Sequence, residues 1–102
     1  MYRLVAAYNH PEDPEKFLDH YRNVHSKLAL KQQGIRNYEW GVCSTPDGST
    51  PPHFLVAVCD WDSKEAMLAD MASPEGQQGA ADLENFAQAG VSFDFYEITK
   101  DI

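Results

Sequence analysis

The sequence predicts a single α+β domain in which the elements follow the order strand, helix, strand, strand, helix, strand. Apolar residues recur at helical spacing in two segments, alternate or run together in four short segments, and are separated by Gly- and Pro-containing turns. A chain of 102 residues has the size of one domain. We therefore expect one domain over residues 1–102.

The first strand and the first helix have clear boundaries. Residues 2–8 form a short run with apolar residues on both faces. Asp13 then precedes Pro14, which is the N-cap and first-turn pattern of a helix. Gly34 is typical of the residue that ends a helix. Between them, apolar residues recur at helical spacing at Phe17, Leu18, Tyr21, Val24, Leu28 and Ala29.

The next two strands form a predicted hairpin. Residues 35–43 alternate, residues 54–59 are nearly all apolar, and Pro46-Asp47-Gly48 is a turn signal. In this pairing Cys43 lies opposite a residue near Phe54, and Cys59 lies opposite one near Tyr38. The thiols would then be roughly 16 Å apart along the ladder, whereas a disulfide needs Cα atoms within about 7 Å. We expect two free, buried thiols.

The second helix is predicted to be broken in two. Asp62 with Glu65 resembles a capping box at its start. Ser73-Pro74 then looks like a second helix start, and the second piece runs towards Phe86. Gly90 ends this region.

Residues 91–96 alternate and complete the sheet as its last strand. Two split βαβ units give a ferredoxin-like fold: a four-stranded antiparallel sheet with both helices on one face. Residues 2–8 and 54–59 are apolar on both faces, so the uncovered sheet face also needs a partner. We expect a homodimer that pairs sheet to sheet.

Charge and hydropathy exclude several classes of partner. Eight basic and sixteen acidic residues give a net charge of −8, which disfavours nucleic acid and anionic membranes. No apolar run approaches the roughly 20 residues of a membrane span. The N-terminal residues lack the pattern of a signal peptide, so we expect a cytoplasmic location.

Tyr21 and His25 are the candidate catalytic residues. They lie four positions apart on an apolar helix face that must pack against the sheet, and Phe17 shares that face. Histidine is the natural acid or base near neutral pH, and tyrosine can donate a hydrogen bond to a substrate oxygen. The alternative is a structural core histidine whose ring bonds Tyr21 or a backbone carbonyl.

No metal or cofactor site is predicted. His20 and His25 are five positions apart, a spacing that does not place both on one face of an α-helix. We expect His20, His10 and His53 to be exposed. The HExxH, CxxC, GxGxxG and GxxxxGK[ST] motifs are absent, which argues against a metal or nucleotide cofactor.

Three further aromatic residues are candidates for a substrate pocket together with Phe17. Tyr38 and Trp40 share one strand face, and Trp61 comes just before the second helix. An aromatic lining would suit a hydrophobic or polycyclic ligand. The alternative is that these residues anchor the core and the dimer interface.

Two stretches of the sequence resemble the EthD family. DPEKFLDHYRNVHSKLAL (13–30) resembles its first-helix signature, with a Phe, a Tyr and a His followed by a small apolar run. WDSKEAMLADMASPEGQQGAADLENFAQAGVSF (61–93) is similar through its Ser-Pro-Glu-Gly and Asp-Leu-x-Asn-Phe segments. The resemblance covers nearly the whole chain except residues 44–52.

The resemblance implies a ferredoxin-like protomer that pairs into a dimeric α+β barrel. The family is named for a protein associated with ethyl tert-butyl ether degradation, and related barrels include cofactor-free monooxygenases, lactone isomerases and dehydratases. The resemblance implies an enzyme, either a cofactor-independent oxidoreductase of the monooxygenase type or a dehydratase or isomerase, for a small apolar or aromatic compound in degradation or secondary metabolism. His25 and Tyr21 match the family's helix positions. The alternative is a non-catalytic ligand-binding or accessory protein of an oxygenase system.

Overall fold

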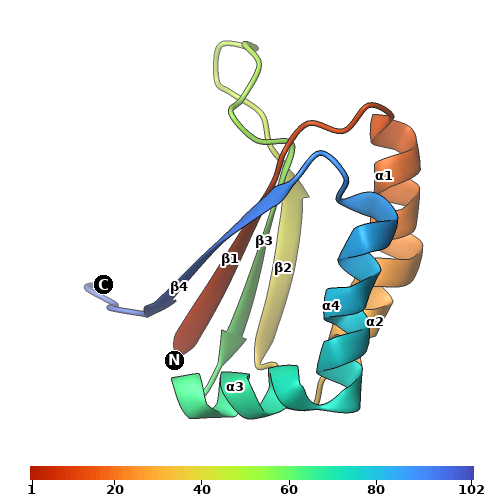
Figure 1. Ribbon diagram of the computed structural model, residues 1–102. Helices are drawn as coiled ribbons and strands as arrows, with labels where there is room; N and C mark the ends of the chain where they lie inside the picture. The colour runs from red at the N-terminus through yellow and green to blue at the C-terminus, as the bar shows by residue number, and fades with distance from the viewer.

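A computed structural model describes residues 1–102 and shows a four-stranded antiparallel sheet covered by helices on one face (Figure 1). The strand order is β2-β3-β1-β4, which confirms the predicted ferredoxin-like fold. The strands are β1 (Tyr2–Tyr8), β2 (Asn37–Val42), β3 (Leu55–Trp61) and β4 (Val91–Glu97). The helical elements are α1 (Pro14–His20), η1 (Tyr21–His25), α2 (Ser26–Leu30), α3 (Lys64–Ala72) and α4 (Pro74–Phe86).

The first helical segment starts as predicted but is not a continuous α-helix. The Asp13 side chain accepts a hydrogen bond from the Lys16 backbone N–H at 3.1 Å, so Asp13 is the N-cap. At η1 the backbone forms a π turn, in which the Ser26 N–H donates to the carbonyl oxygen of Tyr21. Single π turns are rare and are frequent at functional sites.

The break in the second helical segment is confirmed. Ser73 caps α4 by accepting the Gly76 N–H at 3.1 Å, with Pro74 in the first turn. The predicted cap of α3 was wrong by one residue: Ser63, not Asp62, accepts the Ala66 N–H at 3.0 Å. The exposed Asp62 carboxylate instead pairs with the guanidinium of Arg36, 3.2 Å away.

The hairpin register agrees with the sequence. Tyr38 pairs with Cys59, and the Cys43 N–H donates to the Phe54 carbonyl oxygen at 2.8 Å. Both thiols are free, as predicted, although each is half-buried rather than fully buried.

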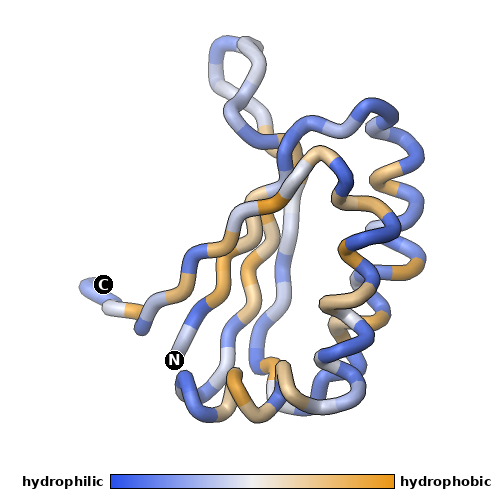
Figure 2. Tube along the Cα trace, viewed as in Figure 1, coloured by the Kyte–Doolittle hydropathy of each residue, from blue (hydrophilic) through white to orange (hydrophobic).

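The main core lies between the sheet and the helices. Inward-facing residues of β1 and β3 pack against aromatic residues of the helices, and the hydropathy trace shows these two central strands as the most continuously apolar part of the sheet (Figure 2). The core members are Leu4, Ala6, Tyr8, Phe17, Tyr21, Phe54, Leu55, Ala57, Trp61, Met67 and Phe86. None of the helices has the length and hydropathy needed to span a bilayer.

The other sheet face carries no helix and combines half-buried valines with an ion pair between a buried carboxylate and a half-buried arginine. Asp60 is only 4% exposed. Its carboxylate accepts from Arg3 Nε at 2.7 Å and Nη2 at 2.9 Å, and from the Asn37 amide at 3.0 Å. Val5 and Val58 are paired across β1 and β3 on this same face.

Candidate active site

A cavity of about 220 Å³ lies between the inner face of the sheet and α4. Most of its lining is apolar, and no Asp, Glu, Lys or Arg side chain contributes to it. The apolar lining includes Leu4, Ala6 and Ala57 from the sheet, Ala80 and Leu83 from α4, and Phe93 and Phe95 from β4. A largely apolar cavity with a few polar groups is the usual form of a small-molecule site.

The structure brings both candidate catalytic residues, Tyr21 and His25, to this cavity. Of the four candidate pocket residues, Tyr38 and Trp61 line it, whereas Phe17 and Trp40 do not. Phe17 is 4% exposed and sits deeper in the aromatic core. Trp40 packs against Tyr21, with ring centroids 5.0 Å apart. Periodicity identifies the face of an element but not the depth that each side chain reaches.

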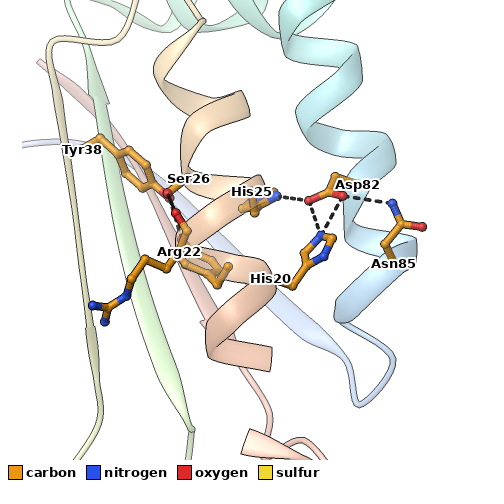
Figure 3. A network of polar contacts seen from close by, with 8 residues as sticks. His20, Arg22, His25, Ser26, Tyr38, Asp82 and Asn85 are labelled. Atoms are coloured by element: carbon orange, nitrogen blue, oxygen red, sulfur yellow. Dashed lines mark hydrogen bonds and ion pairs between the residues drawn. The ribbon is translucent and has the colours of Figure 1, made fainter. Parts of the chain in front are cut away.

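A buried carboxylate on α4, Asp82, completes the surroundings of His25 (Figure 3). Asp82 is 5% exposed. It accepts hydrogen bonds from His25 Nδ1 at 3.0 Å, His20 Nε2 at 2.9 Å and the Asn85 amide at 3.0 Å. Sequence reasoning missed it. The available signal was a charged residue four positions before Phe86, on the buried side of α4.

The prediction that His20 is exposed was wrong, because its side chain is 26% exposed and is bound to Asp82. The spacing argument also failed, since both imidazoles reach one carboxylate. It assumed a regular α-helix, whereas the π turn closes its hydrogen bond over five residues and so brings positions five apart to one side. His53 is half-buried rather than exposed, and His10 is exposed as predicted.

These hydrogen bonds fix the tautomer of His25. Burial acts to raise the pKa of Asp82, but the hydrogen bonds from Asn85, His20 and His25 outweigh it and hold that pKa below its ordinary value. An ionised carboxylate only accepts hydrogen bonds, so the His25 Nδ1 that faces it carries a proton. In neutral His25 the lone pair is therefore on Nε2.

The protonation state of His25 follows from its burial. Burial lowers the pKa of His25, and the hydrogen bond and charge of Asp82 only partly oppose that effect. The charge on His20 lowers the pKa further. His25 is therefore a neutral imidazole near pH 7, oriented by Asp82 and in contact with the cavity. The His25 ring hydrogen-bonds to Asp82, and not to Tyr21 or a backbone carbonyl as the alternative interpretation expected.

Three tyrosines contribute hydroxyl groups at the cavity. Tyr38 donates to the Tyr21 hydroxyl at 2.8 Å, and Tyr8 lies beside them, with its ring centroid 5.7 Å from that of Tyr21. Burial raises the pKa of all three, that of Tyr38 to about 12, so they remain hydrogen-bond donors. Burial likewise raises the pKa of the neighbouring Cys59 to about 12, which keeps that thiol protonated and weakly nucleophilic.

No group of three or more His, Cys, Asp or Glu side chains has an arrangement that could hold a metal ion. The arrangement described above is instead suited to proton transfer. It combines an oriented imidazole, a buried carboxylate and phenolic donors around an apolar space.

The fold and the site define a ferredoxin-like α+β protein with a largely apolar cavity between helices and sheet. The chain belongs to the EthD family, since residues 9–90 match the model of the EthD domain. It is 39% identical over 95 residues to an uncharacterized 11.0 kDa protein in the thcB-thcC intergenic region of Rhodococcus erythropolis, covering 93% of this chain and 92% of that protein.

Solved structures agree with this assignment. The crystal structure of an EthD family protein from Bacillus halodurans is similar with a TM-score of 0.89 and 28% identity, over 97% of this chain and 99% of that one. Two more distant proteins share the fold. A dimeric ferredoxin-like protein from Thermobifida fusca has a TM-score of 0.75 and 15% identity, over 95% of this chain and 90% of that one. A hydroxynitrile lyase from Passiflora edulis has a TM-score of 0.76 and 14% identity, over 99% of this chain and 94% of that one.

Proposed function

We propose that this EthD family protein is an enzyme that transfers a proton on a small, apolar molecule held in the cavity, with His25 as the acid/base. One observation carries the proposal: buried Asp82 holds the Nδ1–H of His25, which leaves the basic Nε2 for a ligand in the cavity that His25 lines. The same division of roles, with a carboxylate that orients and a histidine that transfers the proton, is effective in known enzymes.

In the proposed reaction, His25 Nε2 removes a proton from a carbon or oxygen of the substrate. Asp82 stabilises the imidazolium that forms, and a phenolic hydroxyl of the cavity, from Tyr21 or Tyr8, donates a hydrogen bond to the oxygen on which negative charge develops. The imidazolium then returns the proton to another atom. Removal of a proton is a first step common to isomerases, dehydratases and cofactor-independent oxygenases, which are the reaction types that the resemblance to related barrels suggests.

Deuterium exchange tests the proposal without knowledge of the natural substrate. The protein is incubated in D₂O with small cyclic and aryl ketones such as acetophenone, and NMR follows the loss of the proton next to the carbonyl. We expect catalysed exchange with at least one ketone, and a rate at least about 100-fold lower in His25→Gln. His10→Gln is the matched control, because His10 is an exposed loop histidine outside the cavity.

Two outcomes would overturn this proposal. If His25→Gln exchanges deuterium at the wild-type rate, His25 is not the acid/base. Ketones that bind to the wild-type protein without any exchange would instead favour the non-catalytic ligand-binding or accessory function.

We also propose that the protein is a homodimer that pairs through the helix-free sheet face. The half-buried valines of β1 and β3 give this face an apolar centre, and a two-fold axis lets it complement itself. Native mass spectrometry should give the mass of two chains, and Val58→Lys should give one chain. Leu68→Lys, on the exposed side of α3, should leave the dimer intact. A single-chain mass for the wild type would contradict the proposal.

A further inference from the structure

The cavity carries no formal charge at neutral pH. Its titratable members are His25, whose pKa is lowered by burial, and three tyrosines and one cysteine, whose pKa values are raised by burial. The remaining polar side chains are uncharged: the indole of Trp61, whose Nε1–H donates to Asp70 at 2.7 Å, and the amide of Gln32, whose buried Oε1 has no hydrogen-bond partner. A buried ionic group needs a counter-charge. The lining therefore suits an uncharged ligand and disfavours a carboxylate, phosphate or ammonium group.

The size of the cavity limits the ligand further. A closed apolar cavity of about 150 Å³ accommodates one benzene molecule, and the cavity here has about 220 Å³. It therefore has room for one six-membered ring with a short substituent. Phe93 and Phe95, 41% and 43% exposed, line the cavity from the edge strand β4. They offer apolar contact to a substituent that extends from the cavity.

At the His25 end of the cavity, the polar groups present one donor beside one acceptor. The Tyr21 hydroxyl, which accepts from Tyr38, keeps its own O–H to donate, and neutral His25 supplies the Nε2 lone pair. The ring centroids of Tyr21 and His25 are 5.2 Å apart, so the donor and the acceptor belong to one polar corner of an otherwise apolar space. A hydroxyl or enol group accepts one hydrogen bond and donates another, and so satisfies both.

From these three properties we infer that the ligand is an uncharged compound about one ring in size that carries a hydroxyl group or an enolisable carbonyl. The inference rests on the proposed function in that the same cavity and the same His25 are used. It narrows the substrate class from small apolar compounds to neutral phenols, cyclic alcohols and their keto forms.

The test measures binding alone, by calorimetry, with four probes: 4-ethylphenol, ethylbenzene, 4-ethylbenzoate and 2-naphthol. We expect 4-ethylphenol to bind at least about tenfold more tightly than ethylbenzene or 4-ethylbenzoate, which corresponds to 1.4 kcal/mol. We expect 2-naphthol, with its second ring, to bind more weakly than 4-ethylphenol.

Two pairs of variants locate the binding in the cavity. Ala80→Leu narrows the cavity from the α4 side and should weaken the binding of 4-ethylphenol by about tenfold. Ala81→Leu, at the adjacent exposed position outside the lining, should not. Tyr8→Phe removes a phenolic hydroxyl from the lining and should weaken the binding of 4-ethylphenol, whereas Tyr2→Phe, on the same strand but outside the lining, should not.

Each contrary result overturns a defined part of the inference. If 4-ethylbenzoate binds as tightly as 4-ethylphenol, the ligand need not be uncharged. If ethylbenzene binds as tightly, the ligand needs no hydroxyl group. If 2-naphthol binds as tightly, the size limit is wrong. Binding that Ala80→Leu does not weaken places the probe outside the cavity and overturns the whole inference. If the phenol binds as expected but no ketone exchanges deuterium, the proposed function fails while the ligand class stands.

Discussion

Two buried carboxylates, Asp60 and Asp82, occupy opposite sides of the sheet and have different partners. They are 4% and 5% exposed, and the pKa of each is held below its ordinary value. For Asp60 the main cause is the hydrogen bonds from the Arg3 guanidinium. For Asp82 burial opposes ionisation, and hydrogen bonds from an amide and two imidazoles overcome it.

The difference separates a structural ion pair from a group suited to chemistry. Arginine keeps its charge at every pH that the fold experiences, so the pair of Arg3 and Asp60 has one charge state. Histidine changes its charge between about pH 5 and 8. The cluster of His20, His25 and Asp82 can therefore gain or lose a proton while the protein stays folded.

Removal of the fixed cation should have the largest effect on stability. Arg3→Met leaves the Asp60 carboxylate buried without its counter-charge, and we expect the free energy of unfolding to fall by about 3 kcal/mol. Denaturant titration measures it. Arg36→Met is the control, because it breaks an exposed pair with Asp62 and should cost less than about 1 kcal/mol. Equal losses in the two variants would contradict the structural role of the Arg3–Asp60 pair.

Asp82→Asn should cost less stability but change the titration of His25. The amide keeps the shape and part of the hydrogen bonding, so we expect a loss of about 1 to 2 kcal/mol. Because Asp82 raises the pKa of His25 against the effect of burial, that pKa should fall in the variant. NMR titration of the histidine ring protons measures it. Asp19→Asn, on the exposed side of α1, should leave the His25 pKa unchanged, and a rise in Asp82→Asn would refute the assignment.

His25 and the two buried carboxylates should also lose their contributions to stability in different pH ranges. His25 has a lower pKa when folded than its ordinary value of 6.5, so the unfolded chain takes up the proton first. Stability should therefore decline as pH falls below 6.5 towards the folded pKa of His25, with a slope of at most about 1.4 kcal/mol per pH unit.

The contributions of Asp60 and Asp82 have the same sign but a different range. The folded pKa of each is below 3.8, so their stabilisation is present above that value and is lost as pH falls through the folded pKa values. Denaturant titration at a series of pH values separates the histidine contribution from the carboxylate contribution. His25→Gln should flatten the decline in the free energy of unfolding below pH 6.5 and leave the further decline below pH 3.8. A decline of the same slope in His25→Gln would assign it to another group.

His20→Gln should have the smallest effect. Glutamine can still donate an N–H to Asp82, so we expect the stability to change by less than about 0.5 kcal/mol. The charge on His20 lowers the pKa of His25, so that pKa should rise in the variant. The same NMR titration measures it. His53→Gln, outside the cluster, should have no effect, and an unchanged His25 pKa in His20→Gln would show that the two imidazoles are not coupled.

Local signals in the sequence predicted the fold because local chemistry determines its boundaries. Asp13 before Pro14 and Ser73 before Pro74 mark helix starts by hydrogen bonds within three residues. The error at Asp62 arose because two potential caps are adjacent, and a distant partner, Arg36, binds the first of them. The π turn has no comparable local signal, so the first helix was predicted as continuous.

The site was predicted only in part, for the same reason. Helical spacing placed Tyr21 and His25 on the face towards the sheet, and both line the cavity. The contact between His25 and Asp82 joins residues 57 positions apart, which no local pattern encodes. Phe17 lies in the aromatic core, and half-buried Trp40 packs against Tyr21 from the edge strand β2, so neither lines the cavity. These positions likewise depend on how the helices pack on the sheet.

The π turn also makes the length of the sequence between His20 and His25 a diagnostic character. The π turn absorbs one residue more than an α turn and still keeps the two histidines on one side of the helix. A relative that lacked one residue here could reach the same arrangement with an ordinary α-helix, because positions four apart also share a face. Counting the residues between the two histidines in an alignment would therefore show whether a relative brings both imidazoles to its carboxylate through a π turn or through an α turn.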